Sequence, residues 1–374
     1  MGPSAYNGGS MHLTNPMAPA GKTTHLVLPA IGTLLLVALA LLLWHRGAPP
    51  GTWIASWQLQ TPFTIARRGL AAAATRSHVY VVGGMDNDNH YVAQTEYAAI
   101  LPDGRLDRWQ LTSSLNEPRF YLAAVVAGDY LYAIGGANGA RGQDNVPTAT
   151  VERAAIRSDG SLDPWQRVSY LTVPRRGLQT AVYRNHIYAI GGYDGEFLKS
   201  VELADIGANN SLSGWHLDPE HAVVDRYIHS ATSWNDRLYL LGGHEQNSEV
   251  ISYGDVEMTR IGTDGRLEPW RIQPSVLETP RFIAAAFALG RHIYMLGGHN
   301  GRNRLRSVEM APLDPGGRVG TWSFTTPLVE ARSATALAVA NGRVYVMGGM
   351  GTGGALNSVE MAEQNRNGQL GHYQ

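Results

Sequence analysis

The chain has 374 residues and a formal net charge of −1, and charged residues make up only 16% of the sequence. This balance gives no electrostatic reason to expect nucleic acid or an acidic membrane surface as a partner. Because the chain contains no cysteine, disulfides, thiolate nucleophiles, zinc–thiolate sites and iron–sulfur clusters are excluded. The 43 glycines, and the excess of tyrosine and tryptophan over phenylalanine, are typical of many short strands joined by tight turns and predict an all-β class.

An uncharged apolar run follows an N-terminal tail, residues 1–24, that we expect to be flexible. The run from Leu26 to Trp44 has nineteen residues without a charge, enough for a helix to cross a hydrocarbon core about 30 Å thick. We therefore expect one transmembrane signal-anchor helix within residues 25–46. A cleaved signal peptide is the alternative, because Ala38-Leu39-Ala40 resembles a cleavage site, but the apolar run continues past it.

The charges that flank this run are nearly balanced, with Lys22 and the terminal amine on one side and His45 and Arg46 on the other. A short tail more often stays in the cytoplasm while a large following domain is exported. The expected localisation is therefore a single-pass membrane protein whose main domain, residues 52–374, is extracytoplasmic. Residues 47–51 (GAPPG) predict a short, stiff linker between the two.

The main domain is internally repetitive. A glycine pair recurs with spacings of 52, 56, 51, 55 and 51 residues, which indicates six units. The pairs are Gly83-Gly84, Gly135-Gly136, Gly191-Gly192, Gly242-Gly243, Gly297-Gly298 and Gly348-Gly349.

Four further columns keep register with the glycine pair. A tyrosine stands three residues before its first glycine: Tyr80, Tyr132, Tyr188, Tyr239, Tyr294 and Tyr345. An arginine stands sixteen residues before it: Arg67, Arg119, Arg175, Arg226, Arg281 and Arg332. A glutamate follows the pair at a variable distance: Glu96, Glu152, Glu202, Glu257, Glu309 and Glu360. An aromatic residue comes thirteen residues after each glutamate: Trp109, Trp165, Trp215, Trp270, Trp322 and Tyr373. Fixed spacings predict strands, and the variable spacing between the glycine pair and the glutamate predicts a loop that accepts insertions.

The arginine, the strand that ends Ile-Tyr-Ala-Ile-Gly-Gly, and the Ser-Val-Glu-Met segment followed by a turn and tryptophan resemble Kelch repeats. The resemblance covers nearly everything from Trp53 to Gln374 and implies a six-bladed β-propeller with one four-stranded blade per repeat, inner strand first. The blades are expected near residues 67–117, 119–173, 175–224, 226–279, 281–330, and 332–374 together with 52–61. In blade number and expected export, the chain is similar to the bacterial sialic-acid mutarotases.

The two ends of the domain are predicted to complete one blade. The sixth unit stops one residue after Tyr373 and so lacks an outer strand, whereas residues 52–60 precede the first arginine and place Trp57 in the tryptophan column. Full closure removes the unpaired edges that invite aggregation. We therefore predict that the N-terminal strand pairs with residues 359–363.

The arginine and glutamate columns occur in every unit, which favours a structural role over a binding role. If each arginine pairs with the glutamate of its own sheet, removing one partner leaves a buried charge and costs about 3–5 kcal/mol.

Binding residues should instead be those that depart from the repeat, near the arginine column or directly after the glycine pairs. The resemblance to Kelch propellers implies that the loops carrying these two sets lie on one face. The candidate binding residues are Arg68, Tyr121, Arg176, Tyr193, Asp194, Tyr227, His229, His244 and His299. Arginine and tyrosine at a shallow mouth suit anions, sugars or acidic peptide side chains, but ordinary rim residues would give the same pattern. Loop histidines are common, so we expect no metal and no cofactor.

No Ser-His-Asp order, phosphate loop or HExxH motif appears. The sequence therefore favours a non-catalytic module that binds a protein or a glycan on the loop face, and that is held to the membrane by the N-terminal helix. A carbohydrate-active enzyme, such as a sugar mutarotase or epimerase, is the alternative implied by the resemblance.

Overall fold

The structure, a computed structural model, describes residues 52–139, 145–244 and 252–374. The expected tail, the predicted transmembrane helix at residues 25–46 and the linker all lie outside these ranges. Within them, no helix has the length and apolar character needed to span a bilayer. Residues Trp53–Gln374 form one compact unit.

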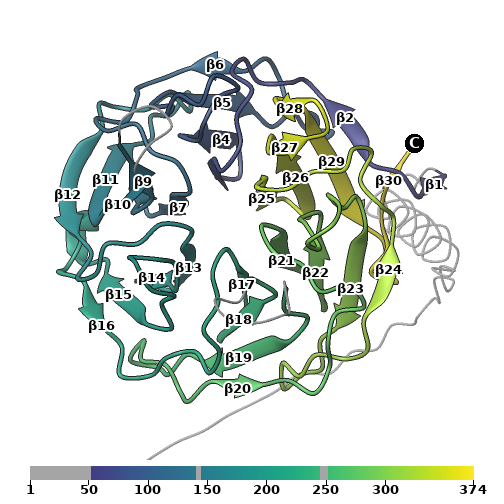
Figure 1. The fold of residues 1–374 in the computed structure, drawn as a ribbon. Helices are drawn as coiled ribbons and strands as arrows, with labels where there is room; N and C mark the ends of the chain where they lie inside the picture. The colour runs from purple at the N-terminus through teal and green to yellow at the C-terminus, as the bar shows by residue number, and fades with distance from the viewer. Residues whose placement is uncertain (1–51, 140–144, 245–251) are drawn as a thin grey trace, which may run out of the picture. The chain divides into compact units, whose positions relative to one another are not determined.

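This unit is a ring of six antiparallel sheets around a central axis (Figure 1). Blade 1 contains β3 (Ala71–Ala74), β4 (His78–Val82), β5 (Thr95–Ala99) and β6 (Gln110–Leu111). Blade 2 contains β7 (Ala123–Ala127), β8 (Tyr130–Ile134), β11 (Thr150–Ala155) and β12 (Gln166–Tyr170). Blade 3 contains β13 (Gln179–Tyr183), β14 (His186–Ile190), β15 (Val201–Asp205) and β16 (His216–Leu217). In each blade the first strand lies nearest the axis and the last lies outermost (Figure 1).

The other three blades follow the same plan. Blade 4 contains β17 (Ser230–Trp234), β18 (Arg237–Leu241), β19 (Val256–Arg260) and β20 (Arg271–Ile272). Blade 5 contains β21 (Ala285–Leu289), β22 (His292–Leu296), β23 (Val308–Pro312) and β24 (Ser323–Thr325). Blade 6 contains β25 (Ala336–Ala340), β26 (Arg343–Met347), β29 (Val359–Gln364), β30 (Leu370–Tyr373), β1 (Trp53–Ile54) and β2 (Gln58–Gln60). The ring is therefore a six-bladed β-propeller.

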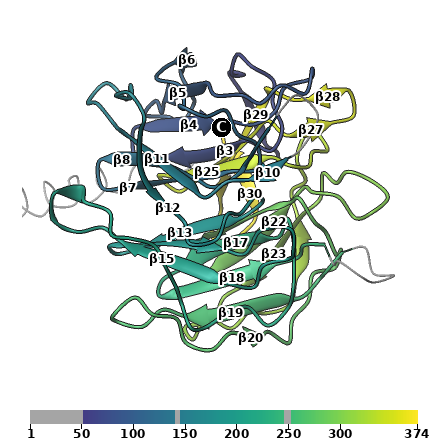
Figure 2. The ribbon, with the colours of Figure 1, turned by 60° about the vertical axis from the view of Figure 1, so that its left-hand side comes forward.

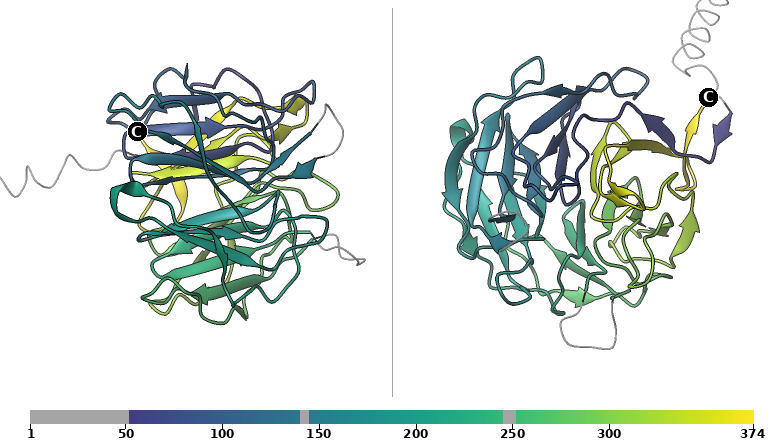
Figure 3. Two further views of the ribbon diagram at one scale, coloured as in Figure 1. Left: turned by 90° about the vertical axis from the view of Figure 1, so that its left-hand side faces the viewer. Right: turned by 45° about the horizontal axis from the view of Figure 1, so that its top comes forward.

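Three short elements decorate the ring. They are the ribbon of β9 (Ala137–Asn138) with β10 (Val146–Pro147), the ribbon of β27 (Met350–Gly351) with β28 (Gly354–Ala355), and the 3-10 helix η1 (Ala208–Asn210). In the turned view, β10, β27 and β28 lie on one face of the ring (Figure 2). The edge-on view places the C-terminus on the other face (Figure 3, left).

The predicted closure is confirmed, because Leu59 of β2 pairs with Glu360 of β29. The sixth unit does not lack an outer strand, however: β30 pairs with β29 through Glu363 and Gln364, and β1 pairs with β30. The outer edge of blade 6 is thus shared between the two ends of the chain.

The sixth aromatic position is filled by Trp57 rather than by Tyr373. Trp57 is buried, and its Nε1 donates to the Thr326 carbonyl at 3.0 Å, as the Nε1 of Trp165 donates to the Ser113 carbonyl at 2.9 Å. Tyr373 instead remains 37% exposed at the edge.

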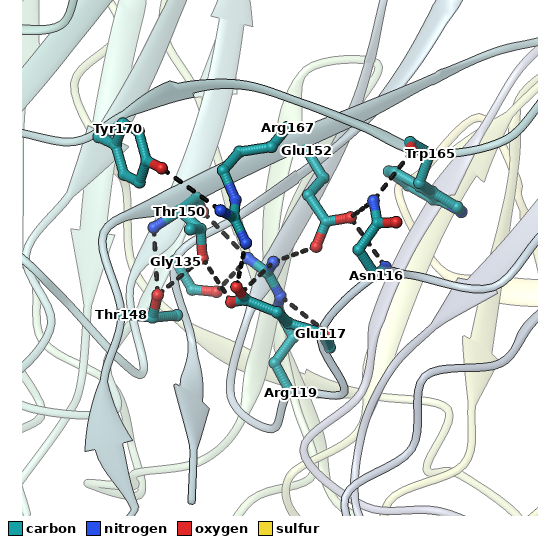
Figure 4. Close-up of polar contacts among 10 residues, drawn as sticks. All are labelled: Asn116, Glu117, Arg119, Gly135, Thr148, Thr150, Glu152, Trp165, Arg167 and Tyr170. Atoms are coloured by element: carbon teal, nitrogen blue, oxygen red, sulfur yellow. Dashed lines mark hydrogen bonds and ion pairs between the residues drawn. The ribbon is translucent and has the colours of Figure 1, made fainter.

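Each blade is stabilised by a buried ion pair between the arginine and the glutamate of its own repeat unit. The pairs are Arg67–Glu96, Arg119–Glu152, Arg175–Glu202, Arg226–Glu257, Arg281–Glu309 and Arg332–Glu360. Figure 4 shows the pair of blade 2. Arg119 also donates to the carbonyls of Gly135 at 3.1 Å and Thr150 at 3.0 Å, and the second oxygen of Glu152 accepts the Asn116 N–H at 2.9 Å. The pair therefore ties the loop entering the first strand to the second and third strands.

Neighbouring blades are joined by the tyrosine column. The hydroxyl of Tyr188 donates to the carbonyl of Gly265 in the next blade at 2.6 Å, and that of Tyr345 donates to Gly104 across the closure at 2.7 Å. The glycine turn is needed because a Cβ at Gly265 would lie 2.4 Å from the His186 ring. Burial raises the pKa of Tyr345 to about 12, so these hydroxyls stay protonated and remain donors.

Candidate binding mouth

Short turns entering the first strands meet around the central axis. The third residue of each turn has positive φ: Gly69, Tyr121, Gly177, Ile228, Ile283 and Ala334. This backbone region is costly for β-branched residues. It is held here by a ring of hydrogen bonds between neighbouring blades, in which, for example, the Tyr121 N–H donates to the Gly69 carbonyl at 2.8 Å and the Ala334 N–H donates to Ile283 at 2.8 Å.

The second residue of each turn lies opposite the residue that follows the glycine pair. Backbone bridges join Arg68 to Met85, Phe120 to Ala137, Arg176 to Tyr193, Tyr227 to His244, Phe282 to His299 and Ser333 to Met350. The two sets of candidates chosen from the sequence therefore lie side by side. We call the surface formed by these twelve residues and Tyr121 the mouth.

Arg176 is the most unusual side chain of the mouth. Its guanidinium lies 4.8 Å from the centre of the Tyr193 ring and 5.7 Å from that of Tyr227, and the two rings are 5.4 Å apart. Phe197, which was not among the candidates, packs against both rings. The buried Nε of Arg176 has no hydrogen-bond partner, and no carboxylate of the described residues forms an ion pair with this arginine.

Arg68 occupies the matching place in blade 1. It donates to the Met85 sulfur at 3.2 Å, the Asp86 carbonyl at 3.2 Å and the Asn89 side-chain oxygen at 2.6 Å, again without an ion pair to a carboxylate in the part of the chain that is described. Tyr121 lies near both arginines. Burial and the neighbouring Tyr227 raise the pKa of Tyr121, while the two arginines oppose this shift, so its hydroxyl is a neutral donor beside two cations.

The two histidines that follow glycine pairs flank one phenylalanine. His244 stacks on Phe282 with ring centres 5.2 Å apart, and His299 lies 5.4 Å from the same ring. Nδ1 of His299 accepts the N–H of Gly301 at 2.9 Å, and burial, together with Arg304, lowers its pKa. His299 is therefore neutral at pH 7.

Asp194 and Asp86, which lie near the mouth, accept hydrogen bonds from backbone N–H groups of their own loops. Asp194 is exposed and accepts the Glu196 N–H at 3.1 Å. Asp86, Asp88 and His90 are the one group of described residues that brings three ligand atoms within 4.8 Å of one another. Asp86 already accepts the N–H groups of Asp88 and His90 at 2.9 Å, so the geometry of an ordinary turn explains the cluster.

His229 lies beneath the mouth rather than in it. It takes the place that is leucine in blades 1 to 3, and it is 1% exposed. Neither ring nitrogen forms a hydrogen bond. Burial lowers the pKa of His229 to about 3 and the charge of Arg226 acts in the same direction, although the carbonyls of Arg226 and Ile190 lie close enough to oppose the shift. The imidazole is therefore neutral.

The floor of the mouth is a cavity of about 60 Å³ to which all six blades contribute, including Gly177, Ile228 and His229. A second cavity of about 180 Å³ continues along the axis and is lined mainly by alanines of the inner strands. The axis is thus a narrow channel that admits small groups.

Comparison with known proteins agrees with this geometry. Residues 174–203 and 331–361, in the third and sixth units, match the Kelch motif. The chain is a six-bladed Kelch-repeat β-propeller. The solved structure of YjhT superposes on this Kelch propeller with a TM-score of 0.65 at 14% identity, covering 84% of this chain and 99% of that one; a likeness at this identity shows the fold alone.

Curated relatives share the repeats at low identity. Beta-scruin of Limulus polyphemus is 23% identical over 65% of this chain and 26% of its own length. Kelch-like protein 36 of Bos taurus is 25% identical over 74% of this chain and 42% of its own length. The Kelch propeller thus spans less than half of these relatives, whose other parts have no counterpart in the match.

The sequence pattern located most of the mouth but missed its phenylalanines. Phe120 and Phe282 stand at the second turn position, the same column as Arg68 and Arg176. Reading this column in all six units would have found them. Phe197 lies in the variable loop and has no column to reveal it.

Proposed function

We propose that this Kelch propeller is a binding module whose mouth holds an acidic group of a protein or glycan ligand between Arg68 and Arg176. The observation that carries the proposal is the environment of the Arg176 guanidinium. This group packs over two tyrosine rings and has no carboxylate partner among the described residues.

The contrast with the repeat supports this interpretation. Every arginine of the arginine column is buried against a glutamate of its own blade, so the fold neutralises the cations it needs for stability. Arg68 and Arg176 follow two of these arginines directly and are only partly buried. A hydrogen bond between such a guanidinium and a carboxylate contributes about 1.5–3 kcal/mol, and the planar fork suits a two-oxygen ligand.

The described residues that line the floor cavity include one imidazole and no carboxylate. A sugar mutarotase or epimerase must move protons and needs positioned acids and bases. The lining therefore supports binding better than the enzymatic alternative.

The membrane tether is part of the proposal. The uncharged run from Leu26 to Trp44 has the length of a membrane span, and eight residues separate its end from the start of β1. We infer that it holds the propeller outside the cytoplasmic membrane, where the mouth meets extracytoplasmic ligands.

The test is a thermal-shift measurement on the full chain in detergent with two acidic probes, glucuronate and hexaglutamate, and with glucose and hexaglutamine as neutral matches. At a concentration of about 100 times the dissociation constant, a ligand adds about 2.7 kcal/mol and raises the midpoint by roughly 4 °C. We expect a shift with at least one acidic probe, and loss of that shift in Arg176→Gln.

The matched control is Arg318→Gln, which removes an exposed arginine in the turn region of blade 5, away from the mouth. The control should keep the shift. Equal shifts with acidic and neutral probes, or an unchanged shift in Arg176→Gln, would overturn the proposed role of the arginines.

A further inference from the structure

The ring of hydrogen bonds around the axis has one gap. Five neighbouring pairs of turns are joined by a backbone hydrogen bond of 2.8–2.9 Å. Between blades 3 and 4, the corresponding bond from the Ile228 N–H to the Gly177 carbonyl is not formed, although both residues lie in the described part of the chain. A free donor and a free acceptor therefore face the same junction.

His229 adds two buried ring nitrogens at this junction, and neither forms a hydrogen bond, although the carbonyls of Arg226 and Ile190 lie close to the ring. The equivalent residues in the other blades are Leu70, Leu122, Leu178, Ala284 and Thr335. The His229 ring packs where Leu122 and Leu178 pack in their blades, so closely that a Cβ on Gly191 would lie 2.5 Å from its Cε1. Leaving a buried polar group without a hydrogen bond is costly, so a leucine here would give a more stable propeller.

The gap opens directly beside Arg176. Gly177 follows Arg176 in sequence, and Ile228 follows Tyr227, so each free backbone group belongs to the residue after one of these two mouth residues. The absence of a side chain at Gly177 also matters, because a Cβ there would lie 2.7 Å from the Tyr227 ring. The Tyr227 ring therefore lies against both the Arg176 guanidinium and Gly177, and it connects the arginine site to the junction.

The chemistry of the junction selects an uncharged group. A neutral imidazole offers one donor and one acceptor, as do the Ile228 N–H and the Gly177 carbonyl together. The described lining of the cavity carries no charged side chain, and the nearby Arg226 disfavours a cation. A volume of about 60 Å³ accepts a hydroxyl-sized group but not a bulky side chain.

We propose that the junction of blades 3 and 4 is a hydroxyl-binding subsite, in which His229, the Ile228 N–H and the Gly177 carbonyl recognise a hydroxyl group of a ligand whose acidic group is held at Arg176. This inference rests on the proposed function and narrows it: the ligand carries a hydroxyl close to its acidic group. His229 determines the preference for that hydroxyl.

The experiment compares two carboxylates of similar ring size, glucuronate and cyclohexanecarboxylate, by titration calorimetry against the full chain in detergent. The second lacks every hydroxyl. The wild type should bind glucuronate more tightly by roughly 3- to 10-fold, the worth of a net hydrogen bond. His229→Leu should abolish this preference while keeping the binding of cyclohexanecarboxylate, and His229→Gln, which retains a donor and an acceptor, should keep part of it.

Ser230→Ala is the control, because Ser230 is the next buried residue, its hydroxyl donates to the Ala284 carbonyl at 2.9 Å, and it does not line the cavity. The Ser230→Ala variant should prefer glucuronate to cyclohexanecarboxylate by the same factor as the wild type. Binding of both carboxylates with equal affinity by the wild type, or an unchanged preference in His229→Leu, would overturn the subsite and leave the arginine site standing. Binding of neither would overturn the proposed function and this inference with it.

Discussion

Replacing His229 by leucine should stabilise the propeller, and by an amount that grows as the pH falls. At pH 7 the substitution removes two buried nitrogens without partners, which is expected to gain about 1–3 kcal/mol. The new side chain is the one that blades 1 to 3 carry at the same place, so the packing has precedent within the same molecule.

The pH dependence follows from the pKa of His229, which burial lowers from 6.5 to about 3 in the folded chain. Between these values the unfolded chain binds a proton that the folded chain does not, so the wild type loses stability as the pH falls below 6.5. The proton-binding polynomials of His229 in the unfolded and folded chains, taken as a ratio, give a loss of about 2 kcal/mol in the free energy of unfolding at pH 5. The leucine variant has no such group, so its advantage should widen by that amount between pH 8 and pH 5.

The assay is guanidinium unfolding of wild type and His229→Leu, both as the full chain in detergent, at pH 8 and pH 5. Other titrating groups shift both proteins alike and cancel in the difference. A difference in unfolding free energy that stays constant between the two pH values would refute the neutral, buried state of His229. A less stable leucine variant at pH 8 would refute the equivalence of this position with Leu122 and Leu178.

Further substitutions and one deletion test the scaffold. Arg119→Ala leaves Glu152 buried without its partner and should cost about 3–5 kcal/mol; a variant whose thermal midpoint matches the wild type would contradict the structural role of the column. Tyr188→Phe removes the hydroxyl bound to Gly265 and should cost about 1–3 kcal/mol in chemical unfolding. Tyr132→Phe should cost less, because the Tyr132 hydroxyl accepts a long hydrogen bond, of 3.5 Å, from the Arg153 guanidinium. Deleting residues 53–60 removes β1, β2 and the buried Trp57 and exposes the β29 edge, so the variant should aggregate, as measured by size-exclusion chromatography. Deletion of residues 2–9 is the control of equal length. A 53–60 deletion variant that stays monomeric and stable would refute the closure.

The blade plan could be derived from the sequence because the repeat fixes it. Six glycine pairs at nearly constant spacing place the second strands, and the arginine and glutamate columns mark the first and third. The contacts between blades could not be derived in the same way. The hydroxyl of Tyr80 meets the carbonyl of Gly160, eighty residues further along the chain, and no periodicity within one unit reports that meeting.

The candidate site was less predictable because it depends on exceptional backbone conformations. Ile228 and Ile283 have φ values of 47° and 44°, which no propensity would suggest for β-branched residues. The positive φ of Ile228 turns the chain so that Tyr227 faces the mouth and His229 enters the core. For this reason His229, expected at the mouth from its place in the sequence, lies beneath it.

The repeat also explains why departures from it are informative. Each blade repeats the same ion pair, and most blades repeat the same tyrosine bond and the same inner turn, so stability is distributed over six nearly equal units. A single junction can then carry polar groups without partners while the other five keep the ring closed. The junction of blades 3 and 4 combines the one missing ring bond, the two unbonded nitrogens of His229 and the unbonded Nε of Arg176. These unbonded polar groups gather beside a guanidinium that has no carboxylate partner among the described residues. A binding site requires such unbonded groups, whereas a purely structural junction would have avoided them.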